Sequence, residues 1–218
     1  MTGPDQNRLL ILASRSPRRA AILGEAGIEF RVVTTDIDED RLLSGPGSLT
    51  DAVQRLALEK AKTAAGFEPG AFVLGADTIV VLDGQILGKP GSSGSAVDML
   101  HRLSGRSHEV VTGVAVVGPD GDSHSDFVST SVFMRVLGDD EIADYVATGS
   151  PLDKAGGYGI QDGSFAPVES YDGCDLNVVG LPMCVTSELL EKVGLLPPGE
   201  MTCHGHARPG AVWMQVPK

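Results

Sequence analysis

Residues 9–27, LLILASRSPRRAAILGEAG, decide the fold class of this chain. The stretch opens with a short apolar run of the kind that forms a buried strand. Ser16 and Pro17 then provide an N-cap and a first helical residue, and Gly27 ends the predicted helix. A strand that leads straight into a helix is the opening unit of an α/β protein.

Strand and helix patterns continue along the rest of the chain. Hydrophobic periodicity predicts strands at residues 30–33, 72–82, 85–87, 109–117 and 126–137, and helices at residues 51–65, 95–103, 139–147 and 182–193. Asp83 and Gly84 predict a type I′ hairpin. Thr50 is expected to cap the first of these helices and Gly66 to close it, after an acidic loop at residues 36–40. Because crossover-linked and hairpin strands occur together, the sequence predicts an α/β fold with a mixed twisted sheet flanked by helices.

Composition narrows the class of protein. The chain has 218 residues, 42% of them hydrophobic, and a net charge of −12, so it can bury a core but is unsuited to binding long nucleic acid. Three cysteines without a CxxC motif predict neither a disulfide framework nor a structural zinc site, and they fit the cytoplasm. No apolar run approaches the about 18 residues of a membrane span, so no membrane partner is expected. We expect one domain over residues 1–196 and a mobile Pro/Gly-rich tail over residues 197–218.

An anion site is predicted where the first helix begins. Arg18 and Arg19 lie in its first turn, where the helix dipole disfavours further positive charge unless an anion binds there. Free backbone N–H groups, the hydroxyls of Ser14 and Ser16, and two guanidinium groups together suit a phosphate or polyphosphate. The arginines could instead lie on a solvated face, so the motif alone leaves both interpretations open.

Other charged side chains are expected in unusual places. Asp77 interrupts an apolar strand, and a buried carboxylate needs a metal, a cation or a proton, unless it caps a turn. Lys60 lies on the apolar face of its helix, where a lysine commonly snorkels to solvent, and Lys89 follows the hairpin. With the two arginines, these lysines could neutralise a triphosphate while Glu39 and Asp77 hold a metal beside it. Such a set suits phosphoryl or nucleotidyl chemistry.

A glycine-rich segment at residues 153–163, DKAGGYGIQDG, would let the backbone approach a ligand closely, with Lys154 and Gln161 as polar contacts. The chain lacks a Walker A motif and a complete dinucleotide-binding fingerprint, so P-loop and Rossmann sites are disfavoured. It also lacks the GxSxG and HExxH motifs of serine hydrolases and zincins. The segment Cys203–His206 could bind a metal, but an incidental occurrence is the better interpretation in such a tail.

The chain resembles the Maf family of nucleoside triphosphate pyrophosphatases from about Leu9 to Leu195. The matching motifs are LASRSPRR (12–19), Glu39, LALEKA (56–61), LGADTIV (74–80), GKP (88–90), LSG (103–105), PLDKAGGYGIQ (151–161) and NVVGLP (177–182). The resemblance implies an α/β fold with a central cleft, similar to inosine triphosphate pyrophosphatases, and a homodimer. It also implies hydrolysis between the α and β phosphates, which yields a nucleoside monophosphate and pyrophosphate.

The resemblance further implies roles for individual residues. Asp77 is expected to be the proton acceptor, with Glu39 and Asp77 at a divalent metal, Mg²⁺ or Mn²⁺. Contacts to the substrate are expected from Ser14, Ser16, Arg18, Arg19, Lys60, Thr78, Lys89, Lys154 and Gln161. The segment DKAGGYGIQ is similar to that of the subgroup acting on dTTP and UTP, whereas the 7-methyl-GTP subgroup has a different segment there.

Two other functions stay open at this point. A nucleotide-sensing regulator of cell division, suggested by the family's association with septum formation, would bind a triphosphate with little or no hydrolysis. A nucleotidyltransferase would need an acceptor other than water, so release of free monophosphate in water would argue against it.

Overall fold

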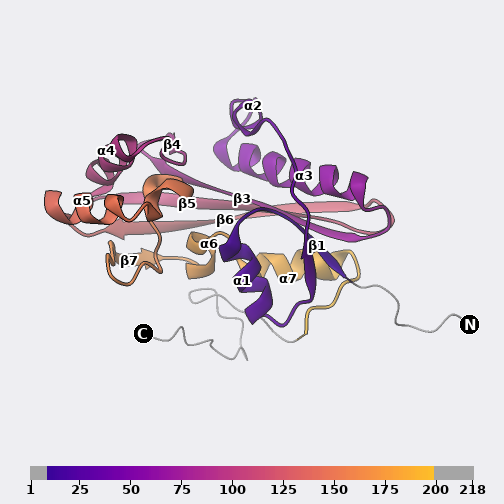
Figure 1. Cartoon of the computed structure of the whole chain (residues 1–218). Helices are drawn as coiled ribbons and strands as arrows, with labels where there is room; N and C mark the ends of the chain where they lie inside the picture. The colour runs from indigo at the N-terminus through magenta and orange to yellow at the C-terminus, as the bar shows by residue number, and fades with distance from the viewer. Residues whose placement is uncertain (1–8, 199–218) are drawn as a thin grey trace, which may run out of the picture.

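The computed structural model describes residues 9–198, apart from the side chain of Asp40, and is built on a seven-stranded sheet (Figure 1). The strands are β1 (Leu10–Ala13), β2 (Phe30–Val32), β3 (Phe72–Leu82), β4 (Gln85–Leu87), β5 (Ser107–Val117), β6 (Ser123–Met134) and β7 (Val168–Asp172). Their order is β2-β1-β3-β5-β6-β7, and β4 pairs with β3. β1 runs parallel to β2 and β3, while the remaining pairs of this sheet are antiparallel. The predicted mixed sheet is therefore confirmed.

Helices cover both faces of the sheet. They are α1 (Pro17–Glu25), α2 (Glu39–Leu43), α3 (Leu49–Phe67), α4 (Ser93–Leu103), α5 (Asp139–Ala147), α6 (Asp175–Val179) and α7 (Met183–Lys192). α3 lies on one side of the sheet, and α1, α6 and α7 lie on the other (Figure 1). Alternation along β1 explains this arrangement, because Ile11 packs with α3 whereas Leu10 and Leu12 pack with α1 and α7. The predicted α/β class with flanking helices is confirmed.

Turn and cap residues act locally as the sequence predicts. The Oγ of Ser16 accepts a hydrogen bond from the backbone N–H of Arg19 at 3.4 Å, and Pro17 is the first residue of α1. The hairpin between β3 and β4 turns at Asp83 and Gly84, whose φ angles of 51° and 75° suit a type I′ turn. Residues at the start of α1 and residues of β4 line the same cavity.

α3 begins and ends at different residues from those predicted. Ser48, and not Thr50, is the N-cap, because its Oγ accepts from the Asp51 N–H at 3.1 Å while the Asp51 carboxylate accepts from the Ser48 N–H at 2.9 Å. This capping box satisfies two N–H groups reciprocally. Gly66 lies within the helix, which continues to Phe67, since one glycine costs a helix only about 1 kcal/mol relative to alanine.

The short elements α2, β7 and α6 form where neither helix nor strand was predicted, as do two 3-10 helices at Ser150–Asp153 and Ala155–Gly157. α2 begins within the predicted acidic loop, which is a correction, and β7 and α6 follow the glycine-rich segment. α2, β7 and α6 each have five residues, too few to show a hydrophobic period in sequence. Their conformation depends on the rest of the fold.

α3 rests directly on β3 and β5 because both strands carry glycine where the helix crosses them. A Cβ atom at Gly75 would lie 2.3 Å from a backbone carbonyl oxygen of α3, and one at Gly113 would lie 2.5 Å from another. No side chain fits at such distances. This close approach brings Lys60 of α3 against Asp77 of β3.

Residues 1–8 and 199–218 lie outside the described residues, and so do most of the predicted mobile tail and the segment Cys203–His206. The prediction of one domain over residues 1–196 stays a prediction. Between residues 9 and 198, no helix is long and apolar enough to cross a membrane.

Candidate active site

A cavity of about 650 Å³ brings together segments that are far apart in sequence. Its wall is formed by the turn between β1 and α1, by the middle of β3, by the loop after β4 and by the glycine-rich segment that starts at Asp153. All of the residues predicted for the site line it, namely Ser14, Ser16, Arg18, Arg19, Glu39, Lys60, Asp77, Thr78, Lys89, Lys154 and Gln161. The fold therefore places these residues around one space, while their individual roles stay predictions.

Lys60 joins the two carboxylates of the cavity. Its ammonium nitrogen lies 2.6 Å from Asp77 Oδ1 and 2.7 Å from Glu39 Oε1. Lys60 and Asp77 are only 8% and 9% exposed, so loss of Lys60 would leave a nearly buried carboxylate without compensation, whereas loss of Asp77 would leave Lys60 paired with Glu39. Lys60 does not snorkel to solvent and Asp77 does not cap a turn, so both of these alternatives are wrong.

Glu39 reaches the same ammonium from the first residue of α2. Burial by itself would raise the pKa of the Glu39 carboxyl. The hydrogen bond and charge of Lys60 outweigh this and lower the pKa below its usual value, with smaller contributions from Lys89 and Arg19. Glu39 is therefore ionised at neutral pH. The sequence did not predict α2, so only the structure shows that Glu39 lies beside Lys60.

The fit of a divalent metal depends on Glu39 and Asp77. Among residues 9–198, no three His, Cys, Asp or Glu side chains are grouped to hold a metal ion. Each of the two carboxylates presents one oxygen to Lys60 and has a second oxygen with no hydrogen bond from a described residue. Mg²⁺ is commonly held by one or two carboxylates together with substrate phosphates. The residues thus fit a Mg²⁺ or Mn²⁺ ion that arrives with a phosphate ligand.

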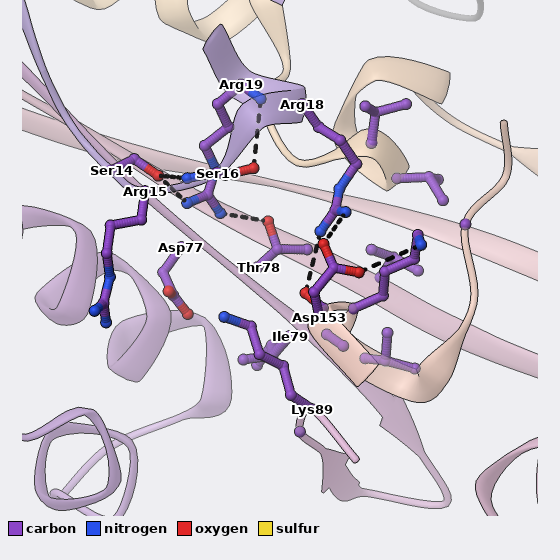
Figure 2. Close-up of a pocket in the computed structure, with 18 of the residues that line it drawn as sticks. Ser14, Arg15, Ser16, Arg18, Arg19, Asp77, Thr78, Ile79, Lys89 and Asp153 are labelled. Carbon is purple, nitrogen blue, oxygen red and sulfur yellow. Dashed lines mark hydrogen bonds and ion pairs between the residues drawn. The ribbon is translucent and has the colours of Figure 1, made fainter. Parts of the chain in front are cut away.

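Arg19 lies buried in the wall of the cavity, where neutral atoms hold its guanidinium. Nε donates to the Gly180 carbonyl at 2.7 Å, Nη1 donates to Ser14 Oγ at 3.0 Å, and Nη2 donates to Thr78 Oγ1 at 3.0 Å. Figure 2 shows this group beside Ser14 and Thr78, at the edge of the space around Asp77. Burial lowers the pKa of Arg19, and the charge of Asp77 offsets part of that effect. A buried cation held by neutral groups suits an anionic ligand.

The hydroxyls of Ser14 and Ser16 accept hydrogen bonds from the protein. Ser14 Oγ accepts from the Ser16 N–H at 3.2 Å and from Arg19, and Ser16 Oγ accepts from the Arg19 N–H. Within the described part of the chain, neither hydroxyl proton has an acceptor. Both protons are therefore available for an oxygen of a bound phosphate.

Arg18 is held by a residue to which the sequence assigned no role. Its guanidinium donates to Asp153 Oδ2 at 2.8 Å and to the Asp153 carbonyl at 3.3 Å (Figure 2). Burial alone would raise the pKa of Asp153, but the hydrogen bond and charge of Arg18 lower it. The two side chains are 28% and 57% exposed, so a ligand can reach the pair. The sequence held one signal for Asp153, namely an acidic residue directly before Lys154, which was itself predicted to contact the substrate.

The remaining predicted contacts differ in their surroundings. Lys89 is exposed, extends toward Asp77 (Figure 2), and makes no ion pair or hydrogen bond within residues 9–198. Lys154 is buried, and its ammonium donates to the carbonyl and hydroxyl of Ser150 at 2.6 and 2.7 Å. Gln161 is exposed in the wall of the cavity. Lys89 is thus available to an anion, whereas Lys154 also holds its own segment together.

Comparison with known proteins finds relatives along most of the chain. A family model described as Maf-like protein matches residues 9–193. The dTTP/UTP pyrophosphatase of Citrifermentans bemidjiense is 48% identical over 193 residues, which cover 88% of this chain and 98% of that protein. The dTTP/UTP pyrophosphatase of Geotalea uraniireducens is 50% identical over 188 residues, which cover 86% of this chain and 96% of that protein.

Solved structures give a partial backbone overlap. A nucleoside-triphosphatase / dITP/XTP pyrophosphatase from Mycobacterium abscessus overlaps 59% of this chain and 74% of its own, with 17% identity and a TM-score of 0.37. A Ham1 protein from Staphylococcus aureus overlaps 57% of this chain and 71% of its own, with 15% identity and a TM-score of 0.38. On the match of the family model and the near full-length identity to its relatives, this chain belongs to the Maf-like protein family.

Proposed function

We propose that this protein is a nucleoside triphosphate pyrophosphatase, which hydrolyses the bond between the α and β phosphates of dTTP and UTP. The products are a nucleoside monophosphate and pyrophosphate. One observation carries the reaction type: Asp77 and Glu39, joined by Lys60, share a single cavity with a wall of basic side chains. The name of the two relatives supports dTTP and UTP as substrates.

In this proposal Asp77 is the general base. It takes a proton from a water molecule as the water oxygen forms a bond to the α phosphorus. The bond from that phosphorus to the bridging oxygen breaks, and pyrophosphate leaves with the electron pair. Lys60 contacts Oδ1 of Asp77, which holds the carboxylate in place, and Oδ2 has no hydrogen bond from a described residue.

Charge on the phosphates is neutralised by fixed donors around the cavity. Arg18, Arg19 and Lys89 supply cations, and Ser14 and Ser16 supply hydroxyl protons. Donors aimed at the leaving pyrophosphate each contribute a factor of about 10² to 10³ in rate in comparable sites. We place the base of the nucleotide toward the glycine-rich segment, where Lys154 and Gln161 lie in the cavity wall.

A divalent cation, Mg²⁺ or Mn²⁺, belongs to this proposal. Glu39 and Asp77 would hold it together with phosphate oxygens of the substrate. When bound, such an ion neutralises phosphate charge and polarises the phosphorus that is attacked. We also propose that the protein works as a homodimer in the cytoplasm, which light scattering of the purified protein and cell fractionation would test.

The test is pyrophosphate release from a panel of nucleoside triphosphates in Mg²⁺ or Mn²⁺. We expect release from dTTP and UTP, with loss of at least about 10²-fold in Asp77→Asn, because this change keeps the shape and removes the base. Asp98→Asn, an exposed position on α4, serves as the matched control with unchanged rate.

Other outcomes would point elsewhere. Release mainly from a purine nucleotide keeps the reaction and refutes the base preference. Binding without release would support the regulator of cell division associated with septum formation, which is not favoured because the relatives are named for a hydrolytic activity. Near-normal turnover in Asp77→Asn would remove Asp77 from its role as base.

A further inference from the structure

We propose that Thr78 and Thr112 form a hydrogen-bond relay that orients the guanidinium of Arg19, and that Thr78 is a positioning residue rather than a phosphate donor. The inference rests on the proposed function, since it takes Arg19 as a ligand of the substrate phosphates. Thr78 lies in the cavity wall, one residue after Asp77. Thr112 lies behind it on β5, is 0% exposed, and is not among the residues that line the cavity.

The direction of each hydrogen bond in the relay follows from its far end. Thr112 donates its single hydroxyl proton to the carbonyl oxygen of Asn177 at 3.0 Å. The contact of 2.9 Å between the hydroxyls of Thr112 and Thr78 must then use the proton of Thr78. With its proton used, Thr78 Oγ1 can only accept, and it accepts from Nη2 of Arg19 at 3.0 Å.

This direction separates Thr78 from the two serines of the same cavity. The hydroxyls of Ser14 and Ser16 accept from N–H groups and keep their protons for a phosphate oxygen. The proton of Thr78 points away from the cavity, into the sheet, and its lone pair points at Arg19. The two serine hydroxyls are thus suited to bind substrate, whereas the Thr78 hydroxyl is suited to orient the Arg19 guanidinium.

A rigid anchor holds the far end of the relay. Asn177 is 0% exposed, and its Nδ2 donates to the Val110 carbonyl at 2.8 Å and to Thr130 Oγ1 at 2.9 Å. Asn177 lies in α6, and the residue that ends this helix, Gly180, supplies the carbonyl that accepts from Nε of Arg19. Both the relay and the direct contact therefore tie Arg19 to the same short helix.

Close packing leaves little freedom around this contact. Gly180 has a φ of 118°, and a Cβ atom there would lie 3.1 Å from Thr78 Oγ1 and 3.6 Å from Nε of Arg19. Within residues 9–198, each hydrogen bond of the Arg19 guanidinium goes to a neutral oxygen. No carboxylate fixes its orientation, so neutral oxygens do so, and the relay holds one of them.

Kinetics of paired variants test the relay. Thr112→Val removes the hydroxyl at nearly constant volume, and we expect a fall of about tenfold in kcat/KM for dTTP, because Thr78 then no longer holds its hydrogen bond to the charged Arg19 in place. Thr112→Ser keeps the hydroxyl and is expected to restore most of the loss. The matched control is Thr186→Val, which removes another fully buried threonine hydroxyl, bonded to a helix carbonyl at 2.9 Å and remote from the cavity.

A double variant distinguishes aiming from general damage to the fold. If Thr112 acts through Arg19, adding Thr112→Val to Arg19→Ala causes no further fall in kcat/KM. Additive losses, or a Thr112→Ser variant as impaired as Thr112→Val, would overturn the relay. An equal loss in Thr186→Val would do the same.

A measurement without substrate keeps the relay separate from the proposed function. In ¹⁵N NMR of the ligand-free protein, we expect the Arg19 guanidinium hydrogens, assigned with Arg19→Lys, to exchange with water faster in Thr112→Val than in wild type or Thr112→Ser. If wild type hydrolyses no nucleoside triphosphate, the proposed function fails while this comparison still decides the relay. Equal exchange in all three proteins refutes it.

Discussion

Replacement of Lys60 by methionine isolates the charge at the centre of the cavity. Methionine keeps an unbranched apolar stem packed on the sheet and removes the ammonium that lies 2.6 Å from Asp77 and 2.7 Å from Glu39. Asp77, at 9% exposure, is then a nearly buried carboxylate without a cation in contact. Removal of one partner of a buried ion pair typically costs about 3 to 5 kcal/mol.

The expected cost in this protein lies at the lower end of that range. Asp77 faces the cavity, where water can reach it, and Glu39 is 47% exposed, so loss of its contact adds little. We therefore expect Lys60→Met to lower the free energy of unfolding by about 3 kcal/mol. In an Asp77→Asn background the same change leaves no buried charge unpaired, only the half-exposed Glu39, and is expected to cost less than about 1 kcal/mol.

Urea unfolding at neutral pH, followed by circular dichroism, measures both costs. Lys62→Met is the matched control, because Lys62 is an exposed residue on the same helix and its replacement is expected to change stability by less than about 0.5 kcal/mol. If Lys60→Met costs no more than Lys62→Met, the ion pair does not stabilise the fold. If Lys60→Met lowers the free energy of unfolding equally in the wild type and in the Asp77→Asn background, the stabilisation does not come from the Asp77 carboxylate.

Three further predictions concern the wall of the cavity and the core. Asp153→Asn releases Arg18 to bind a phosphate, so the KM for dTTP is expected to fall. The fall is up to about fivefold, since an exposed ion pair is worth at most about 1 kcal/mol. Steady-state kinetics measure it, and an unchanged or higher KM would exclude Arg18 as a phosphate ligand. Burial lowers the pKa of His108 to about 4, so the unfolded chain binds a proton that the folded protein lacks between pH 6.5 and 4. Stability is therefore lost as pH falls through this window, by about 3 kcal/mol from this group, and urea titrations of His108→Gln should lack that loss; a variant that follows the wild-type pH curve contradicts the assignment. Gly75→Ala places a Cβ atom 2.3 Å from the backbone of α3. This clash should lower the free energy of unfolding by about 3 kcal/mol or more and displace Lys60. An unchanged melting temperature would show that the helix can move away freely.

Local chemistry explains which parts of the fold were predictable. Ser16 and Pro17 start α1, and Asp83 with Gly84 turns the hairpin, because caps and tight turns depend on neighbouring residues. The predicted cap of α3 was wrong because Thr50 and the true N-cap lie two positions apart and only the reciprocal capping box distinguishes them. α2 was missed for a related reason, since five residues carry no period.

The candidate site was predictable as far as charge appeared in unexpected places. Two arginines in a first helical turn, a carboxylate in an apolar strand and a lysine on an apolar helix face each marked a residue that the structure places in the cavity wall. The family resemblance then supplied their expected roles. Residue types in sequence could therefore point to residues of the cavity wall, although not to their partners.

Partners were decided by packing. Arg18 contacts Asp153 across 135 positions of the chain, Lys60 contacts Asp77 across 17, and Thr112 contacts Asn177 across 65. No local rule relates residues at such separations, since their distances depend on how α3, β5 and α6 pack on one sheet. Sequence was thus sufficient for the fold class, the family and several residues of the cavity wall. The direction of each hydrogen bond and the partner of each charged side chain could be determined only from the folded structure, because hydrogen bonds and ion pairs depend on distances of a few ångströms.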